Sequence, residues 1–303
     1  MEAHARAGID IVGRSLRYAE IEKYGPRYRL LRLGSCDFEF DVAEGVLSNP
    51  SDESITIVSD ALGDVFSGSV TEVLHVAIHP PDCYSFLSPL PAGSSETRRN
   101  VRLQQEAALL AGTERSLHIT ADLVRSESLD DGSTVDWVQV LAVEEAVHER
   151  IYRIVNPLPQ PAKRLVVSMH AAASTLIHVA PPAHAIDPSG FSLAIGMFPH
   201  CVEYVLCRDG VVHFNTYTDP VPPLDVAFFG AHVADRFGLR PRDIDAVYLY
   251  GTDADPGHFS DLESVFDSEV SLLNPLTVLD VDQGGFGADF GAEGYAGCIG
   301  AAL

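Results

Sequence analysis

The residues that could carry out chemistry are concentrated near the start of the chain. Residues 7–21 read AGIDIVGRSLRYAEI: an apolar run reaches Asp10, turns through Gly13, Arg14 and Ser15, and leaves as a second apolar run that ends in an acid. A glycine turn lets the backbone approach an anion, and an arginine guanidinium donates several hydrogen bonds to a phosphate. The pattern is typical of the opening of a nucleotide-binding hairpin.

Two other short clusters contain residue types that bind metals. They are His79-Pro-Pro-Asp82-Cys83 and His200-Cys201. Neither has the helical i, i+4 spacing or the CxxC spacing that brings ligands together around one ion. Packing or loop roles are therefore predicted for these histidines.

The densest positive spot on the chain is Arg98, Arg99 and Arg102, within a predicted helix that begins at Ser94 or Ser95. Helical spacing predicts that the three arginines lie broadly on one face, opposite an apolar stripe that includes Leu103 and Leu110. Two interpretations are open. The arginines are a solvated helix face, or they are a docking surface for an acidic tail or a neighbouring subunit.

The elements that position these residues follow a pattern that occurs twice. Apolar or alternating segments separated by turns predict two strand–turn–strand openings, each with a third strand and then alternating helices and strands. The predicted strands are 8–12, 16–22 and 28–38 in the first half, and 191–195, 202–207 and 211–217 in the second. Residues 84–155 form a small α+β unit inserted in the first half. The pattern favours a duplicated α/β architecture, with the ligand site in the cleft between the halves.

The charge of the chain excludes some partners. Its 303 residues include 43 acids and 20 bases, a formal net charge of −23. Such a surface repels nucleic-acid phosphates and anionic lipid headgroups, so neither is expected as a partner. The excess acid fits either a cationic ligand or a salt-rich cytoplasm. The acids are spread along the whole chain, which favours the second explanation.

The sequence also predicts a cytoplasmic protein. No stretch approaches the roughly 18 consecutive apolar residues of a membrane span, and the N-terminal MEAHARAGID lacks the basic and apolar regions of a secretory signal. The five cysteines are scattered, which fits reduced thiols better than a disulfide framework.

Four stretches of the chain resemble, in the same order, the type IV pilus assembly protein PilM and its relatives FtsA and GspL, a group of actin-like ATPases. They are GIDIVGRSLRYAEI, LSPLPAGSSETRRNVRLQQEAALL, VDWVQVLAVEEAVHERIYRIV and the C-terminal GYAGCIGAAL. The resemblance covers most of the chain. It implies an α/β, duplicated actin-like ATPase (ribonuclease H-like) fold of two lobes, with a small α+β subdomain inserted in the first lobe.

The resemblance implies a division of the chain into three parts. Residues 1–80 and 164–187 form the first lobe, residues 81–163 the inserted subdomain, and residues 188–303 the second lobe with the C-terminal helix. The cover subdomain of the second lobe is expected to be reduced, because only about one helix, at 224–237, fits where the family has several elements.

The resemblance further implies where a nucleotide would bind. Asp10 stands where the family's first aspartate helps to hold Mg²⁺, and Arg17 stands where a lysine is usual. If Mg-ATP binds, Asp10 is the expected metal ligand. The expected cofactor-binding residues are then Asp10, Gly13, Arg14, Ser15, Arg17, Gly196 and Gly251.

The chain departs from the family's nucleotide-binding pattern at three positions. Val12 stands where a glycine is expected, and its side chain would crowd the backbone that must approach a phosphate. Ala194 replaces the aspartate of the second phosphate motif, so one of the two acids that orient Mg²⁺ is missing. Gly251 is single where the adenosine motif has two glycines. The motifs are degenerate, and neither catalysis nor a bound cofactor is expected.

Two functions are therefore compared. The first is a cytoplasmic, non-catalytic actin-like scaffold of a type IV pilus or secretion assembly at the inner membrane. It would bind the short cytoplasmic tail of a membrane partner, along a strand edge between the opening strands and the inserted subdomain. Arg98, Arg99 and Arg102 are the expected partner-binding residues. The alternative, favoured by Asp10, is an ATPase or nucleotide switch that closes around Mg-ATP. Self-association into a homo-oligomer is left open.

The acidic composition gives a first prediction. At low salt, repulsion among the acids is expected to destabilise the fold, and added KCl screens this repulsion. The melting temperature should therefore rise with KCl concentration, as measured by differential scanning fluorimetry. A melting temperature independent of KCl would contradict the adaptation to salt.

Overall fold

The structure is a computed structural model that describes residues 5–69, 71–113, 115–155, 166–179, 190–281, 286 and 290–303. Three sheets form its framework. The first contains β1 (Ala5–Val12), β2 (Ser15–Tyr24), β3 (Arg27–Asp37), β4 (Val73–Ile78), β8 (Val166–Ala171) and β14 (Leu279–Asp280). The second contains β9 (Phe191–Met197), β10 (Val202–Arg208), β11 (Val211–Thr218), β12 (Ile244–Tyr250) and β13 (Val270–Leu272). The third contains β5 (Tyr84–Pro91), β6 (Leu117–Ser128) and β7 (Thr134–Glu144).

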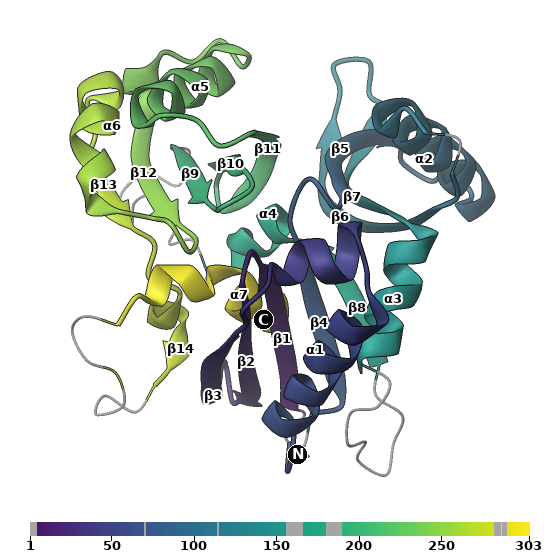
Figure 1. Ribbon diagram of the computed structural model, residues 1–303. Coiled ribbons are helices and arrows are strands. Elements are labelled where there is room, and N and C mark those ends of the chain that lie inside the picture. Colours follow the sequence, from purple (N-terminus) through teal and green to yellow (C-terminus); the bar gives the residue numbers. More distant parts are fainter. Residues whose placement is uncertain are drawn as a thin grey trace.

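Helices cover these sheets. The α-helices are α1 (Asp52–Val65), α2 (Glu96–Ala111), α3 (Glu145–Val155), α4 (Ala172–Thr175), α5 (Pro223–Asp235), α6 (Phe259–Phe266) and α7 (Ala296–Ala302). Short π or 3₁₀ turns are η1 (Glu44–Ser48), η2 (Leu176–His178), η3 (Pro241–Asp243), η4 (Pro256–His258), η5 (Pro275–Val278) and η6 (Ala292–Tyr295). Figure 1 shows the second lobe and the inserted subdomain above the first sheet, with α7 near the centre.

The first two sheets share one strand order. It is β3-β2-β1-β4-β8 in the first sheet, with β14 added beside β3, and β11-β10-β9-β12-β13 in the second. In each sheet the three strands that come first in the sequence, β1–β3 or β9–β11, pair antiparallel with one another. The next two, β4 and β8 or β12 and β13, run parallel to β1 or β9. The predicted duplication is therefore confirmed.

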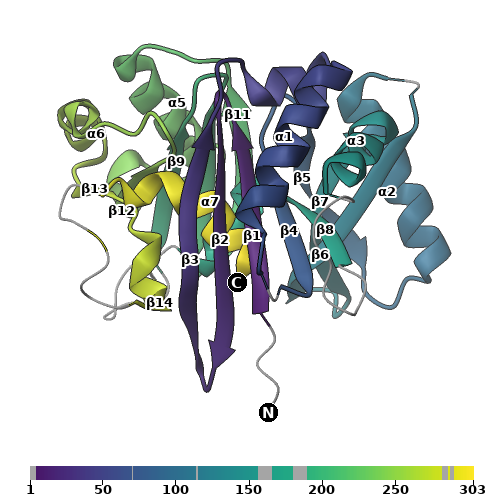
Figure 2. The same cartoon turned by 60° about the horizontal axis from the view of Figure 1, so that its bottom comes forward.

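Strand β1 contributes to two different cores, because successive side chains of a strand point to opposite faces. Ile9 and Ile11 pack with residues of α1 and α3 on one face of the first sheet. Val12 packs on the other face with residues of α7, of the second sheet and of its β9–β10 turn, where Phe198 lies. Figure 2 shows α7 against strands β1 and β2. Asp10, on the same face as Val12, is thereby directed into the space between the lobes.

The end of the chain departs from the predicted division into lobes. Strand β14 pairs with β3, and α7 packs against β1, β2 and β4, so part of segment 188–303 belongs to the first sheet. Gly297 and Gly300 let α7 lie close to Asp10 of β1 and to Thr175 of α4. The sequence predicts this helix but not the sheet that it covers. The boundaries 163/164 and 187/188 fall outside the described residues.

Helix α2 covers the third sheet with a narrower stripe than predicted. Leu103 and Ala107 are buried, and Ala111 packs beside them, whereas the side chain of Leu110 is exposed. The buried ridge runs through every fourth residue, so Leu110 points away from the sheet. The prediction that Leu110 is part of the buried stripe is wrong.

The close packing of α7 on β1 gives a second prediction. A Cβ added at Gly8 would lie 1.9 Å from the carbonyl oxygen of Cys298 in α7, so Gly8→Ala should lower the free energy of unfolding by at least about 1–3 kcal/mol. In the control, Gly63→Ala within α1, an added Cβ meets nothing within 4 Å, and a gain of about 0.5–1 kcal/mol is expected. Urea unfolding measures both. Unchanged stability of Gly8→Ala would contradict the packing.

Candidate functional site

The turns of the two opening hairpins meet between the lobes. Gly13 has a φ of 51°, and a Cβ added to it would lie 3.0 Å from Cγ of Pro199 in the second hairpin. The carbonyl oxygen of Gly13 accepts a hydrogen bond of 2.6 Å from the backbone N–H of Val42. The first turn is therefore packed against protein at the position where a phosphate would lie if a nucleotide bound.

Asp10 belongs to a chain of buried polar side chains that joins the two lobes. Its Oδ1 lies 2.8 Å from Nε2 of His79, and Nδ1 of the same ring lies 3.1 Å from Oε1 of Glu203 on β10. The hydroxyl of Tyr250 on β12 donates a hydrogen bond of 2.7 Å to Oε2 of Glu203. Asp10, His79, Glu203 and Tyr250, all at most 7% exposed, are called the buried network below.

The electrostatics of the buried network favour a charged histidine. Burial alone would lower the pKa of His79, but the charges of Asp10 and Glu203, together with their hydrogen bonds, raise it to about 10. Burial and the nearby Glu203 raise the pKa of Tyr250 well above its usual value, so the phenol stays protonated and donates. At neutral pH an imidazolium therefore lies between two carboxylates, one from each lobe.

The space beside Asp10 is filled by other side chains. The ring of Phe198 lies 4.2 Å from the ring of His79 and 5.6 Å from that of Tyr250, measured between centroids. A Cβ added at Gly297 of α7 would lie 2.2 Å from Oδ2 of Asp10. A cavity between the hairpins, lined by residues that include His79 and Phe198, measures about 20 Å³, whereas ligand pockets usually measure about 300 Å³ or more. A magnesium-bound polyphosphate does not fit beside Asp10 in this arrangement.

The other predicted residues of the first hairpin make contacts of their own. The guanidinium of Arg14 donates to the carbonyl oxygens of Phe38 and Glu39, at 3.2 and 2.5 Å, and so holds the chain that follows β3. Ser15 begins β2 next to this segment. The guanidinium carbon of Arg17 lies 4.9 Å from the centroid of the Tyr295 ring. Its Nε and Nη1 are buried without a hydrogen bond among the described residues.

The glycines of the second lobe support the packing of aromatic rings. A Cβ added at Gly196 would lie 2.5 Å from Cζ of Tyr250 and 2.7 Å from the ring of Phe198. Gly251 has a φ of 100°, and its N–H donates to the carbonyl oxygen of Glu293 at 3.1 Å. A larger residue at either position would displace its neighbours, so both glycines are accounted for by packing.

Sequence reasoning missed three of the four members of the buried network. His79 was expected to have a packing or loop role, and neither Glu203 nor Tyr250 was singled out. One signal was present: Glu203 is the only acid in the apolar segment VEYVLC. Acids are almost never fully buried without a partner, so a lone acid in a central strand indicates that a buried cation or donor faces it.

The structure separates Arg99 from Arg98 and Arg102, although all three arginines are predicted to share a helix face. Arg98 is exposed, and Arg102 forms an ion pair of 2.7 Å with Glu106. Arg99 lines a hollow of about 290 Å³ between α2 and β6, together with Leu103. The prediction that the arginines lie opposite Leu103 is therefore wrong for Arg99, because the helix turns this side chain toward the sheet.

A cavity lies where strands β6, β8 and β11 approach one another. It measures about 370 Å³ and is called the edge cavity below. Each of these strands is the last strand of its sheet within the described part of the chain. An edge strand presents backbone N–H and C=O groups that have no partner in its own sheet. The cavity therefore brings three such edges together.

Three histidines, His75, His170 and His178, are among the polar side chains that line the edge cavity. Nδ1 of His75 lies 2.9 Å from Nε2 of His170, and the hydroxyl of Ser168 lies 2.8 Å from the same Nε2. Burial, with the neighbouring His170, Arg6 and His178, lowers the pKa of His75 to about 4. The ring of His75 is therefore neutral at physiological pH and can exchange hydrogen bonds with a polar ligand.

Comparisons with known proteins identify the fold. The sequence matches no protein-family model and no curated protein. The structure is similar to a chain of the PilM–PilN type IV pilus biogenesis complex, with a TM-score of 0.73 and 14% identity over 98% of this chain and 97% of that one. It also resembles a protein of unknown function with the actin-like ATPase fold from Bacteroides thetaiotaomicron, with a TM-score of 0.52, 10% identity, and 91% and 93% of the two chains covered. A third similar structure is the ethanolamine utilization protein EutJ from Carboxydothermus hydrogenoformans, with a TM-score of 0.51, 11% identity, and 99% and 89% covered.

These findings define the chain as a protein with the actin-like ATPase fold. Within that class its fold is PilM-like, since nearly the whole of both chains is matched. The predicted α/β fold class is confirmed. Among the described residues, no helix is both long enough and apolar enough to cross a membrane.

The buried network gives a third prediction. The pKa of His79 rises from 6.5 to about 10 on folding, so its ion pairs contribute fully below about pH 6.5 and are lost as the pH rises through 10. The free energy of unfolding, measured by urea titration, should therefore fall across this interval. His79→Gln should flatten the fall and cost about 3–5 kcal/mol at neutral pH, because it leaves buried carboxylates unpaired.

The control for this prediction is His200→Gln. Nε2 of His200 lies 2.5 Å from Oδ2 of Asp41, but the side chain of His200 is 47% exposed. A change of about 0–1 kcal/mol in the free energy of unfolding is therefore expected. If the wild type and His79→Gln lost stability equally steeply with pH, the charged state of His79 would be contradicted.

Proposed function

We propose that the protein is a cytoplasmic, non-catalytic actin-like scaffold of a type IV pilus or secretion assembly at the inner membrane. The observation that carries the proposal is the buried network. Asp10 is engaged by His79, and Phe198 fills the adjoining space. Phosphoryl transfer depends on a metal ion and on precise positioning of the phosphates. Because side chains fill the metal and phosphate position beside Asp10, the role that we propose for the two lobes is to bind a partner protein.

We propose further that the partner is a membrane protein of the PilN type, bound through its short cytoplasmic tail. The similarity of fold to the PilM–PilN complex supports this class of partner. Charge supports it as well. Cytoplasmic segments next to membrane spans carry an excess of lysine and arginine, and a chain with a formal net charge of −23 attracts such segments.

The edge cavity is the favoured place for this tail. An extended peptide can add to a free strand edge through main-chain hydrogen bonds, and side-chain pockets then give specificity. Leu123 of β6 lines the cavity and is 61% exposed, so it offers apolar area to the tail. The sequence predicts a groove between the opening strands and the inserted subdomain, whereas the edge cavity lies between β6 of that subdomain and the edge strands β8 and β11. None of the predicted partner-binding residues Arg98, Arg99 and Arg102 lines this cavity.

One observation favours the alternative of a Mg-ATP-binding switch. Nε and Nη1 of Arg17 are buried without a hydrogen bond among the described residues, and Arg17 is paired in register with Asp10 across β1 and β2. An anion could satisfy these donors. The alternative requires that Asp10 be released from His79 and that Phe198 move away.

A fourth prediction tests the placement of the tail. Labelled peptides that copy the cytoplasmic tails of PilN-type membrane proteins from the same cell should bind the wild-type protein in a fluorescence anisotropy titration. Leu123→Arg should weaken this binding at least about tenfold, or 1.4 kcal/mol, because it introduces at the apolar wall of the edge cavity a positive charge that repels a basic tail.

The matched control is Leu109→Arg on helix α2. Leu109 is 82% exposed in the same subdomain and does not line the edge cavity, so its replacement should leave the affinity unchanged. Equal affinities of the two variants would contradict binding in the edge cavity.

A further inference from the structure

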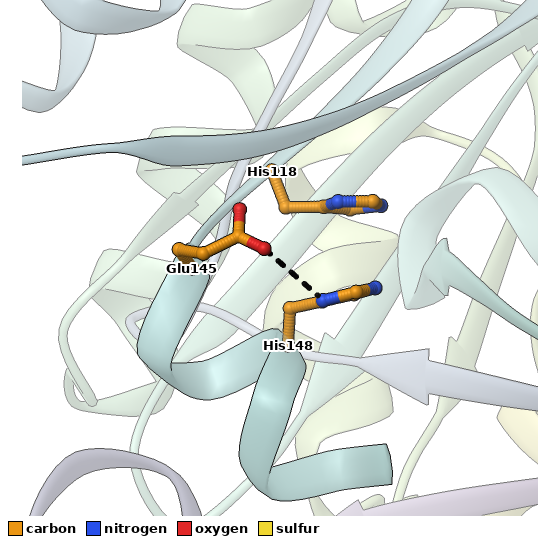
Figure 3. Close-up of side chains that lie close together, drawn as sticks. All are labelled: His118, Glu145 and His148. Atoms are coloured by element: carbon orange, nitrogen blue, oxygen red, sulfur yellow. Dashed lines mark ion pairs between the residues drawn. The ribbon is translucent and has the colours of Figure 1, made fainter.

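Three potential metal ligands converge where the inserted subdomain joins the first lobe. His118 comes from β6, and Glu145 and His148 come from the first turn of α3 (Figure 3). One ligand atom of each lies within 4.8 Å of the others. The two imidazole rings are stacked, with centroids 3.7 Å apart and planes inclined by 14°. Oε1 of Glu145 lies 3.5 Å from Nδ1 of His148.

The local sequence explains this convergence. Strand β7 continues directly into α3, and the antiparallel pairing of β6 with β7 places His118 opposite Val143, close to the start of that helix. Glu145 and His148 are three residues apart on α3, a spacing that places both side chains on one face of a helix. Sequence analysis did not single out these residues, because the ligand from β6 is distant in the sequence.

We propose that His118, Glu145 and His148 bind a divalent transition-metal ion, with Zn²⁺ as the expected occupant. Two imidazoles and one carboxylate are a known zinc ligand set that leaves a fourth position for water. Bonds of about 2.0–2.2 Å place tetrahedral donors roughly 3.3 Å apart. The 3.5 Å separation of Glu145 Oε1 and His148 Nδ1 is close to this spacing. The His118 ring, which is stacked on that of His148, must rotate to direct a nitrogen at the ion.

The surroundings of the cluster favour a cation. Nδ1 of His148 is buried and makes no hydrogen bond among the described residues, and a metal ion would satisfy its lone pair. The side chains of His148 and Glu145 are 19% and 46% exposed, which leaves a path for an ion from solvent.

A bound ion would have a structural consequence. It would join β6 of the inserted subdomain to α3, and α3 packs against α1 of the first lobe. The same strand β6 lines the edge cavity at Leu123. The metal would therefore stabilise the inserted subdomain internally, at the helix that contacts the first lobe. This inference does not depend on the proposed function.

The test is a calorimetric titration of metal-stripped, folded protein with ZnCl₂, with thermal melting in parallel. One-to-one binding and a raised melting temperature are expected, since a ligand that binds only the folded state stabilises it. His118→Ala/His148→Ala should abolish both effects. Asp41→Ala/His200→Ala removes a different exposed acid–histidine pair and should leave both unchanged.

Two further measurements guard against a variant that does not fold. Glu145→Gln preserves the shape of the side chain and should weaken zinc binding at least tenfold. Co²⁺ added to the stripped wild type should give the intense visible absorption of tetrahedral coordination. Absence of zinc binding by the wild type would overturn the proposal, as would undiminished binding by folded His118→Ala/His148→Ala or by Glu145→Gln.

Discussion

The contact between the imidazolium of His79 and the carboxylates of Asp10 and Glu203 is the interaction on which the packing between the two lobes depends. It takes one acid from each of the duplicated sheets and places a single positive charge between them. Removing two acids from water costs several kcal/mol each unless they are paired. The lobes are therefore held together at their deepest point, and their relative position is fixed by a contact with precise geometry.

The rest of the central packing follows from this constraint. Gly297 leaves room for Asp10 beneath α7, and Gly196 leaves room for the ring of Tyr250 that donates to Glu203. Phe198 closes the space between the two rings. Residues that could have surrounded a phosphate thus surround a histidine. The architecture of an actin-like protein is maintained by a network internal to the chain, in keeping with the general separation of fold from function.

Much of the fold could be predicted because it is written in local patterns. The strand–turn–strand openings, the helix from Ser95 and the terminal helix all follow from alternation, turns and small residues. Contacts between distant segments could not be predicted in this way. His79 and Glu203 are separated by more than a hundred residues, and only the packing of the two lobes against each other brings them together. For the same reason, Asp10 could be identified as the central acid of the site while its partner could not.

The most direct measurement is an isothermal calorimetric titration of the purified, folded protein with Mg-ATP in a high-potassium buffer. If the buried network occupies the phosphate position, the heats should be indistinguishable from dilution. One-to-one binding of Mg-ATP would contradict the account. It would mean that His79 and Phe198 yield to the nucleotide and that the lobes act as a switch.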